Sequence, residues 1–360
     1  MKYLIEITQR QLEEIKRLVS QNKYLDLAQF IDAAVENQLH IEKSDLAKEY
    51  RPFGAQVMAD SIASFKSDKA ESPKIFVSEP KDKHCLGLMS LPREIKTVEL
   101  PSDSDLRFIF PEAGPEKNWL WGQVNRIFPI KIGIRYLAAA LGESQTIDLN
   151  AFREKDLRCP ALIEELLRNY EERRGIDRDK CISTGLPGAT PSDYKSHDRY
   201  KNQFLAVYRK DGKLDGALPQ HKFVNIVLEN GKPRIGITKA GLEFALLENP
   251  VLDKEDFSVS LSDAEKDFYI AHLRNCVPGE FAGIRWVLSE IKEGKSRDEI
   301  NSDMSSRFGQ EWKGPSAEFI TTQRAGMIAR ISELGLISKE KTGVKVRYLI
   351  TEKGLELLAQ

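Results

Sequence analysis

The sequence predicts an α+β fold that is mainly helical and is built from several modules. Three observations support this prediction. Apolar residues recur at helical spacing through most of the chain, as they do over residues 130–141. Short alternating stretches flank the turn-forming dipeptides Asn230-Gly231 and Thr342-Gly343, which is typical of β-hairpins. A chain of 360 residues is also long enough for two or three domains.

The first forty-four residues have the pattern of one strand followed by two short helices. Residues 2–7 alternate like a strand, and Thr8 stands where a helix N-cap belongs. Asp26 and Gln29 form a capping-box-like pair that opens the second helix. So small a unit cannot bury enough apolar surface to be stable alone, and we therefore expect it to need a partner.

This pattern resembles the ribbon-helix-helix family. The resemblance implies that the strand pairs with its copy in a second chain, and that the resulting ribbon enters the DNA major groove. The outward residues Lys2, Leu4 and Glu6 would then read bases, although Glu6 would repel phosphates. A module that only dimerises is therefore the alternative. The residues expected in the dimer are Tyr3, Ile5, Ile7, Phe30, Ile31 and Val35.

Residues 45–117 are expected to hold an extension of the second helix and then a partly ordered tether. From about residue 64 the stretch is rich in Ser, Pro, Lys, Asp and Glu, a composition typical of linkers. Apolar bursts at residues 75–77 and 106–110 could dock as edge strands. The alternative is that this stretch is a loop-rich part of the next domain.

Residues 118–255 are expected to form a helical domain that ends in a hairpin. Pro129 suits the first turn of one helix, residues 148–155 suggest a second, and Pro160 opens a third, with Gly175 as its C-cap.

The second half of this domain is less regular. Residues 183–196 are expected to be a flexible linker, followed by a helix around residues 204–208. The hairpin at Asn230-Gly231 should have a loop longer than the tightest type, because Lys232-Pro233 follows it. A helix over residues 239–247 should close the domain.

Residues 256–360 carry the clearest helix signals. Ser262 and Ser296 each begin a capping box, Ser316 can cap a longer helix, and Gly335 marks the end of that helix. A hairpin and a terminal helix, which finishes near Leu358, follow.

Three helices, a hairpin and a helix resemble a winged helix-turn-helix domain. Residues 234–243 resemble residues 347–356, each a strand followed by a Thr-capped helix, which suggests that residues 118–255 are a divergent winged-helix-like unit with an insertion. The resemblance implies that the third helix enters the major groove and the hairpin lies along phosphates. The residues expected to contact DNA are Thr321, Thr322, Gln323, Arg324 and Arg330 on the helix, and Lys339, Lys341, Lys345 and Arg347 on the hairpin.

Composition disfavours several other classes of protein. A net charge of −1 argues against a strongly basic, non-specific nucleic-acid binder. Four scattered cysteines suit reduced thiols in a cytoplasm, and no apolar run is long enough to span a bilayer. The histidines lack metal-ligand spacing, so we expect no metal and no cofactor. Paired glutamates at 164–165 and 171–172 should be solvated on a helix surface, which favours a protein-facing role for the middle domain.

Together these features predict a non-enzymatic, dimeric, cytoplasmic protein that binds double-stranded DNA through its C-terminal winged helix and through its N-terminal ribbon. A transcriptional regulator, a partition protein or a DNA-scaffolding subunit would each fit. The first alternative is a protein-interaction adaptor of a mobile-element or phage-defence system, whose winged helices dock other proteins. The second is an enzyme with an unrecognised site in the middle region.

Overall fold

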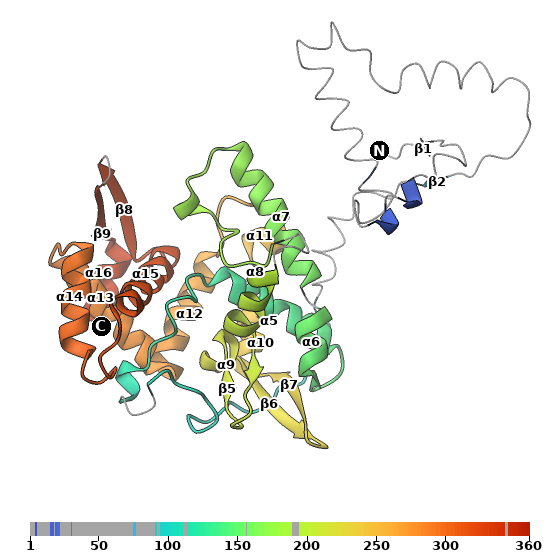
Figure 1. The fold of residues 1–360 in the computed structure, drawn as a ribbon, viewed down its shortest axis with the longest axis horizontal. Coiled ribbons are helices and arrows are strands. Elements are labelled where there is room, and N and C mark those ends of the chain that lie inside the picture. Colours follow the sequence, from blue (N-terminus) through green and yellow to red (C-terminus); the bar gives the residue numbers. More distant parts are fainter. Residues whose placement is uncertain are drawn as a thin grey trace, which may run out of the picture. The chain divides into compact units, whose positions relative to one another are not determined.

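The computed structural model describes residues 4–5, 15–17, 19–21, 30, 75–76, 91, 94–110, 114–155, 157–188, 194–342 and 345–360. These residues form a mainly helical α+β structure with small antiparallel sheets, as predicted. The chain divides into two compact bodies, Met1–Lys83 and His84–Gln360 (Figure 1).

In the first body, strand β1 (Leu4–Ile5) pairs antiparallel with β2 (Ile75–Phe76) of the same chain. Phe30 is half-buried and Ile15 is buried. The other residues of this first body that were expected in the dimer or at the DNA lie outside the described residues. The intermolecular ribbon therefore stays a prediction. They are Lys2, Tyr3, Glu6, Ile7, Ile31 and Val35.

The second body contains two modules with the same order of helices and hairpin. In the first module a short strand joins the hairpin, giving a three-stranded sheet with the order β3-β7-β6. Its elements are α5 (Phe128–Leu141), β3 (Ile147–Asp148), α6 (Leu149–Lys155), α7 (Arg158–Arg173), β6 (Val224–Glu229), β7 (Lys232–Ile237) and α10 (Lys239–Leu246).

The hairpin of the first module is tighter than the sequence suggested. Glu229 pairs with Lys232, so only Asn230 and Gly231 form the turn, with φ of 52° and 75°. Two residues of positive φ are what a type I′ turn requires, and its twist matches that of the strands. The expectation of a longer loop was therefore wrong, because Lys232 and Pro233 belong to β7.

An insertion separates α7 from β6. A helix was expected at residues 204–208, but the helical run lies earlier and Val207 already belongs to a strand. The run ends at Leu205, whose backbone has ψ of −131° and cannot continue a helix. The elements of the insertion are the 3₁₀ turn Arg178–Lys180, α8 (Tyr194–Arg199), the π-helical turn Tyr200–Phe204, β4 (Val207–Tyr208), β5 (Leu214–Asp215) and α9 (Ala217–Gln220).

Two connecting helices, α11 and α12, precede the second module, and the serine caps predicted for residues 256–360 are present. The hydroxyls of Ser262 and Ser296 accept from backbone N–H groups in complete capping boxes, and Ser316 caps the third helix of this module. Gly335 ends that helix with φ of 74°. The elements are α11 (Pro250–Lys254), α12 (Asp263–Cys276), α13 (Pro278–Lys292), α14 (Arg297–Phe308), α15 (Ala317–Glu333), β8 (Ile337–Thr342), β9 (Lys345–Ile350) and α16 (Glu352–Ala359).

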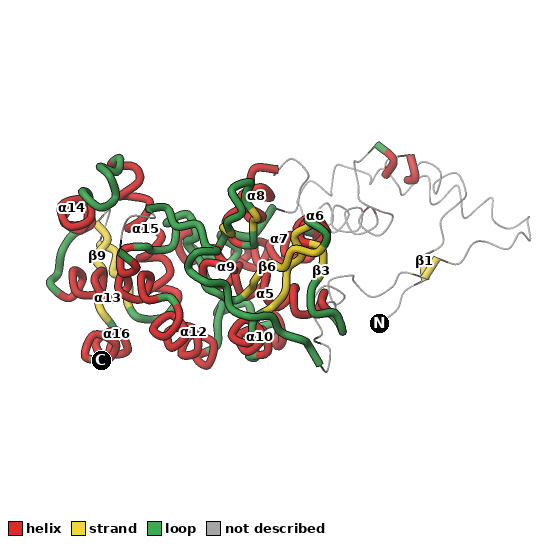
Figure 2. Tube along the Cα trace, turned by 90° about the horizontal axis from the view of Figure 1, so that it is seen from below, coloured by secondary structure: helices red, strands yellow, loops and turns green. Residues whose placement is uncertain are grey.

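The two modules share one hydrophobic core, although a domain boundary was expected between residues 255 and 256. Helix α12 packs on α10 of the first module and on α13 of the second (Figure 2). At this junction the hydroxyl of Tyr269 bonds His221, and Lys131 forms a fully buried ion pair with Glu265 at 2.8 Å. The modules are therefore fixed to each other by a continuous interior.

Part of the expected tether also belongs to this body. The amide of Val98 donates to Ile237 at 2.8 Å, and Leu106 is buried beside β5. The Phe110 ring stacks on Trp312, with centroids 5.7 Å apart. Residues 94–110 are thus docked on the modules. Over this range the structure agrees with the alternative interpretation, which made the stretch a loop-rich part of the next domain.

Candidate nucleic-acid interface

A cleft of about 800 Å³ opens between the two modules. Helix α7, the loop 176–188 and α8 line it from the first module, whereas Ala329 of α15 and Lys339 of β8 line it from the second. Figure 1 shows α7 and the hairpin β8–β9 rising on the same side of the body. The third helix of one module and the hairpin of the other therefore border one hollow.

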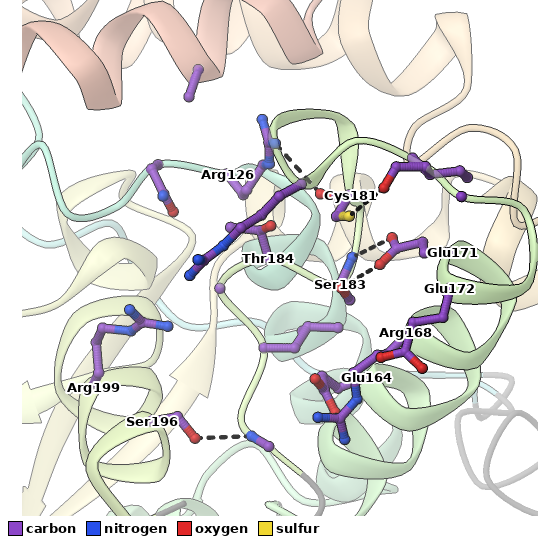
Figure 3. Close-up of a pocket in the computed structure, with 18 of the residues that line it drawn as sticks. Arg126, Glu164, Arg168, Glu171, Glu172, Cys181, Ser183, Thr184, Ser196 and Arg199 are labelled. Carbon is purple, nitrogen blue, oxygen red and sulfur yellow. Dashed lines mark hydrogen bonds and ion pairs between the residues drawn. The ribbon is translucent and has the colours of Figure 1, made fainter.

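Basic side chains reach this cleft from several elements. Figure 3 shows Arg126, Arg168 and Arg199 approaching it from the segment before α5, from α7 and from α8. Among the residues that the structure describes, the lining holds five cations against three carboxylates, which gives a net positive charge of two. Among the described residues of this lining none is aromatic. The five cations are Arg126, Arg168, Arg178, Arg199 and Lys339, and the carboxylates are Glu164, Glu171 and Glu172.

Two of the carboxylates are already engaged by the protein. Glu171 accepts from the Ser183 hydroxyl at 2.6 Å and from its amide at 3.0 Å, which attaches the loop to α7. Glu164 forms an ion pair with Arg168 at 3.2 Å. Both glutamates are buried, so the expectation of solvated carboxylates was wrong for these two. Glu164 and Arg168 therefore cancel as a pair, and the four remaining cations and two carboxylates described in the lining keep the same net positive charge of two.

The loop after Ser183 was expected to be a flexible linker, yet residues 185–188 are buried. A Cβ added to Gly185 would meet Phe204 and Pro129 at 3.0–3.1 Å, and the backbone there has φ of +94°. The Ser196 hydroxyl accepts from the Gly188 amide at 2.9 Å. The described part of this loop is thus a fixed wall of the cleft. The sequence could not indicate this, because the residues that Gly185 approaches, Phe204 and Pro129, lie elsewhere in the chain.

The predicted recognition helix α15 is not available in the expected way. Gln323, Arg324 and Arg330 are only 3%, 7% and 1% exposed, so their expected exposure was wrong. The Arg324 guanidinium donates to Asn301 at 2.8 Å, and burial lowers its pKa. Thr321 is exposed and Thr322 is half-buried, and their contact with DNA stays a prediction.

The face of α15 that carries Gln323 and Arg330 is covered by residues 114–127, which we call the crossing segment. Arg330 donates to the Val124 carbonyl and forms an ion pair with Glu280 at 2.7 Å, both side chains being at most 1% exposed. Gln323 accepts from the Gly122 amide. These bonds satisfy backbone groups of a segment that crosses the second module before entering α5.

Two glycines allow this close approach. A Cβ on Gly326 of α15 would come closer than 3.0 Å to the Gly122 backbone, and one on Gly122 would meet Thr322 equally closely. Glycine inside a helix is unfavourable unless the space is needed. Gly326 was therefore the signal in the sequence, although the sequence does not say which segment approaches it.

The basic residues predicted on the second hairpin do not form a single face. Lys339 pairs with Tyr348, and Arg347 pairs with Glu340, so the strand alternation places Lys339 and Arg347 on opposite faces. Lys339 is half-buried at the cleft, whereas Arg347 is exposed. Lys341 and Lys345 lie on these strands, but their side chains are outside what the structure describes.

The remaining chemistry is sparse in the described part of the chain. There, no three His, Cys, Asp or Glu side chains gather as metal ligands would. No helix among these residues is long and apolar enough to cross a membrane. The chain matches no protein-family model, no curated protein and no solved structure.

Proposed function

We propose that this protein binds DNA and that backbone phosphates lie in the cleft between the two modules. The observation that carries the proposal is the convergence of Arg126, Arg168, Arg178, Arg199 and Lys339 on one hollow bordered by α7 and β8. Guanidinium groups form charge-assisted, bidentate hydrogen bonds to phosphate. The described residues of the lining include no aromatic ring, which suits contact with the backbone better than stacking on bases.

The repeated architecture supports the same proposal. The order of helices and the sheet β3-β7-β6 in the first module resemble those expected of a winged helix with an insertion after its third helix. The second module has three helices, a hairpin and a helix, an order that also resembles a winged helix. In such domains the third helix and the hairpin carry the DNA contacts. Here those contacts would be divided between α7 of one module and β8 of the other.

A salt titration tests this proposal. Duplex affinity should fall as salt rises, and each lost phosphate contact should reduce the log–log slope by about 0.9. The triple variant Arg126→Ala, Arg178→Ala, Arg199→Ala should reduce that slope by roughly 2 to 3. The control removes three exposed lysines of the same body that do not line the cleft, Lys210→Ala, Lys232→Ala and Lys239→Ala.

The two variants carry the same change of net charge, so only position distinguishes them. A slope that changes equally in both would reject the cleft and leave general electrostatic attraction. A wild-type protein that binds neither duplex nor single-stranded DNA at low salt would reject DNA binding altogether.

Protein docking by the second module is the second candidate function. The exposed surface of α15 offers Glu318, Thr321 and Ala325, and the nearby arginines are buried. Such a surface has no positive charge to hold phosphate, so it suits a protein partner better. Pull-down with a Thr321→Arg, Ala325→Arg variant separates the candidates, because it should abolish a protein contact and leave cleft-dependent DNA binding intact.

We also propose that residues 1–44 dimerise the chain. Among the described residues of this body, Leu4–Ile5 pairs with residues 75–76 alone, and the proposal places the partner strand on the other edge of β1. Ile5→Asp should convert a dimer to a monomer in light scattering, because an unpaired charge in an apolar core costs several kcal/mol. A wild-type monomer at micromolar concentration would contradict the proposal.

A further inference from the structure

A second, smaller cavity of about 220 Å³ lies beside the crossing segment. Trp119, Trp121 and Phe108 contribute aromatic surface, and four amide side chains contribute polar atoms. This volume is below the roughly 300–1,000 Å³ of a complete small-ligand site, so it suits one ring system. The four amides are Asn118, Asn202, Gln203 and Gln220.

Trp121 is the first unusual feature of this cavity. Its side chain is 46% exposed, whereas Trp119, two residues earlier, is 6% exposed and lies within an aromatic cluster. An exposed indole at a cavity offers a flat surface on which a base can stack, a contact worth about 1–3 kcal/mol per base. Trp121 is not among the described residues of the hydrophobic core, and its exposed indole can contact a ligand.

Gln203 is the second unusual feature. Its Nε2 donates to Gln123, but its buried Oε1 has no hydrogen-bond partner among the described residues. The neighbouring amides are held in place, since Gln220 donates to the Arg107 carbonyl at 2.7 Å and Asn202 accepts from Arg153 at 2.6 Å. A buried acceptor without a donor is unfavourable. The exocyclic amino group of a base would supply that donor.

The cavity and the basic cleft are lined by neighbouring residues of the same two segments. Gln203 follows Arg199 by four residues in one continuous helical run, which is about one turn. On the other wall, Trp121 precedes Arg126 in the crossing segment. An aromatic and amide-lined cavity thus lies within a short distance of cationic side chains that suit phosphate. This combination is typical of sites for single-stranded nucleic acid.

We infer that this cavity accepts one unstacked base of a DNA strand whose phosphates lie in the cleft. This inference rests on the proposed function. It adds that the site distinguishes single-stranded or locally opened DNA from closed duplex. Paired bases cannot enter, so an enclosed base requires a single-stranded or locally opened segment. The indole of Trp121 stacks on the base, and Gln203 accepts from its amino group.

Fluorescence anisotropy with a labelled single strand of about twelve nucleotides, and with a random duplex, tests the inference. Trp121→Ala should weaken single-strand binding about tenfold, which is about 1.4 kcal/mol, and leave duplex binding within about twofold. Trp121→Phe should retain much of the affinity because the ring can still stack. Tyr194→Ala is the matched control, since Tyr194 is 60% exposed on α8 and does not line the cavity.

Gln203→Leu tests the amino contact separately. It should abolish a preference for oligoadenylate or oligocytidylate over oligothymidylate, because thymine lacks an exocyclic amino group.

The outcomes separate this inference from the proposed function. Unchanged single-strand affinity in Trp121→Ala, with normal duplex binding, overturns the base cavity alone. Equal losses on duplex and single strand also overturn it, because paired bases do not need the cavity. Full competition by adenosine monophosphate would assign the cavity to free nucleotides and reject the strand. Wild-type protein that binds neither form of DNA rejects both proposals.

Discussion

The two modules of the second body close their hairpins in the same way but use their third helices differently. Thr238 and Thr351 each donate their amide to the carbonyl that precedes the hairpin, at 2.9 and 3.0 Å. Each hydroxyl then caps the next helix by accepting from the glycine amide three residues on. The local chemistry of the two modules is therefore the same.

The third helices differ in what covers them. The carboxyl-terminal half of α7 borders the open cleft, whereas one face of α15 is sealed by the crossing segment. The last residue of α15, Glu333, even caps α5 by accepting from the amide of Ile127 at 2.6 Å. The comparison teaches that capping and periodicity define a module, while its neighbours decide which helix face remains available.

The largest expected effect concerns the contact between the crossing segment and α15. Arg330→Ala should lower the free energy of unfolding by about 3–5 kcal/mol in urea denaturation, because it leaves Glu280 buried and unpaired. Arg347→Ala, an exposed residue of the same module, should change it by less than about 0.5 kcal/mol. A double variant Glu280→Leu, Arg330→Met should recover only part of the loss, because it removes the buried charges but leaves the Leu120 amide and the Val124 carbonyl without these partners. Equal effects of the two alanine variants would contradict a buried ion pair.

The close approach of Gly326 to Gly122 tests the same contact through the backbone. Alanine normally stabilises a helix by up to about 1 kcal/mol over glycine, yet Gly326→Ala should destabilise by about 1–3 kcal/mol because its Cβ would clash with Gly122. The control Asn169→Ala, at an exposed position of α7, should be neutral or slightly stabilising. Thermal unfolding would measure both signs. A stabilising Gly326→Ala would show that the crossing segment does not approach α15.

The sequence could predict the elements because their signals are local. The serine caps, the Gly335 stop and the hairpin at Asn230 all depend on residues within a few positions of one another. The seal on α15 and the cleft depend on partners that are far apart in the chain, such as Gly122 and Gly326. A polar pattern on a helix indicates an exposed face only when no second segment covers it, and that information is not local.

Acid should loosen the junction between the first module and α12. Burial lowers the pKa of His221 from 6.5 to about 3 and also lowers that of His272. The unfolded chain therefore binds more protons below pH 6.5, so stability is fully present above that pH and is lost as pH falls.

For His221 the loss should be about 2 kcal/mol between its unfolded pKa and about pH 5. Unfolding free energies measured across this range would show it, and hydrogen exchange should increase first at β6. The non-titrating variant His221→Gln should flatten the profile. An unchanged profile in that variant would assign the acid sensitivity to other groups.

The smallest effect compares the two threonine caps directly. Thr351→Ala should cost about 1 kcal/mol, the usual value of an N-cap. Both hydroxyls also donate to a backbone carbonyl at 2.8 Å, that of Lys222 for Thr238 and that of Gly335 for Thr351. Thr238→Ala should still cost more, because Thr238 is fully buried whereas Thr351 is half-buried. Serine at either position keeps the hydroxyl and should restore most of the stability. If Thr351→Ala had the larger effect in urea denaturation, the cap of the first module would not be the more tightly enclosed of the two. The similarity between the modules would then be limited to their sequence pattern.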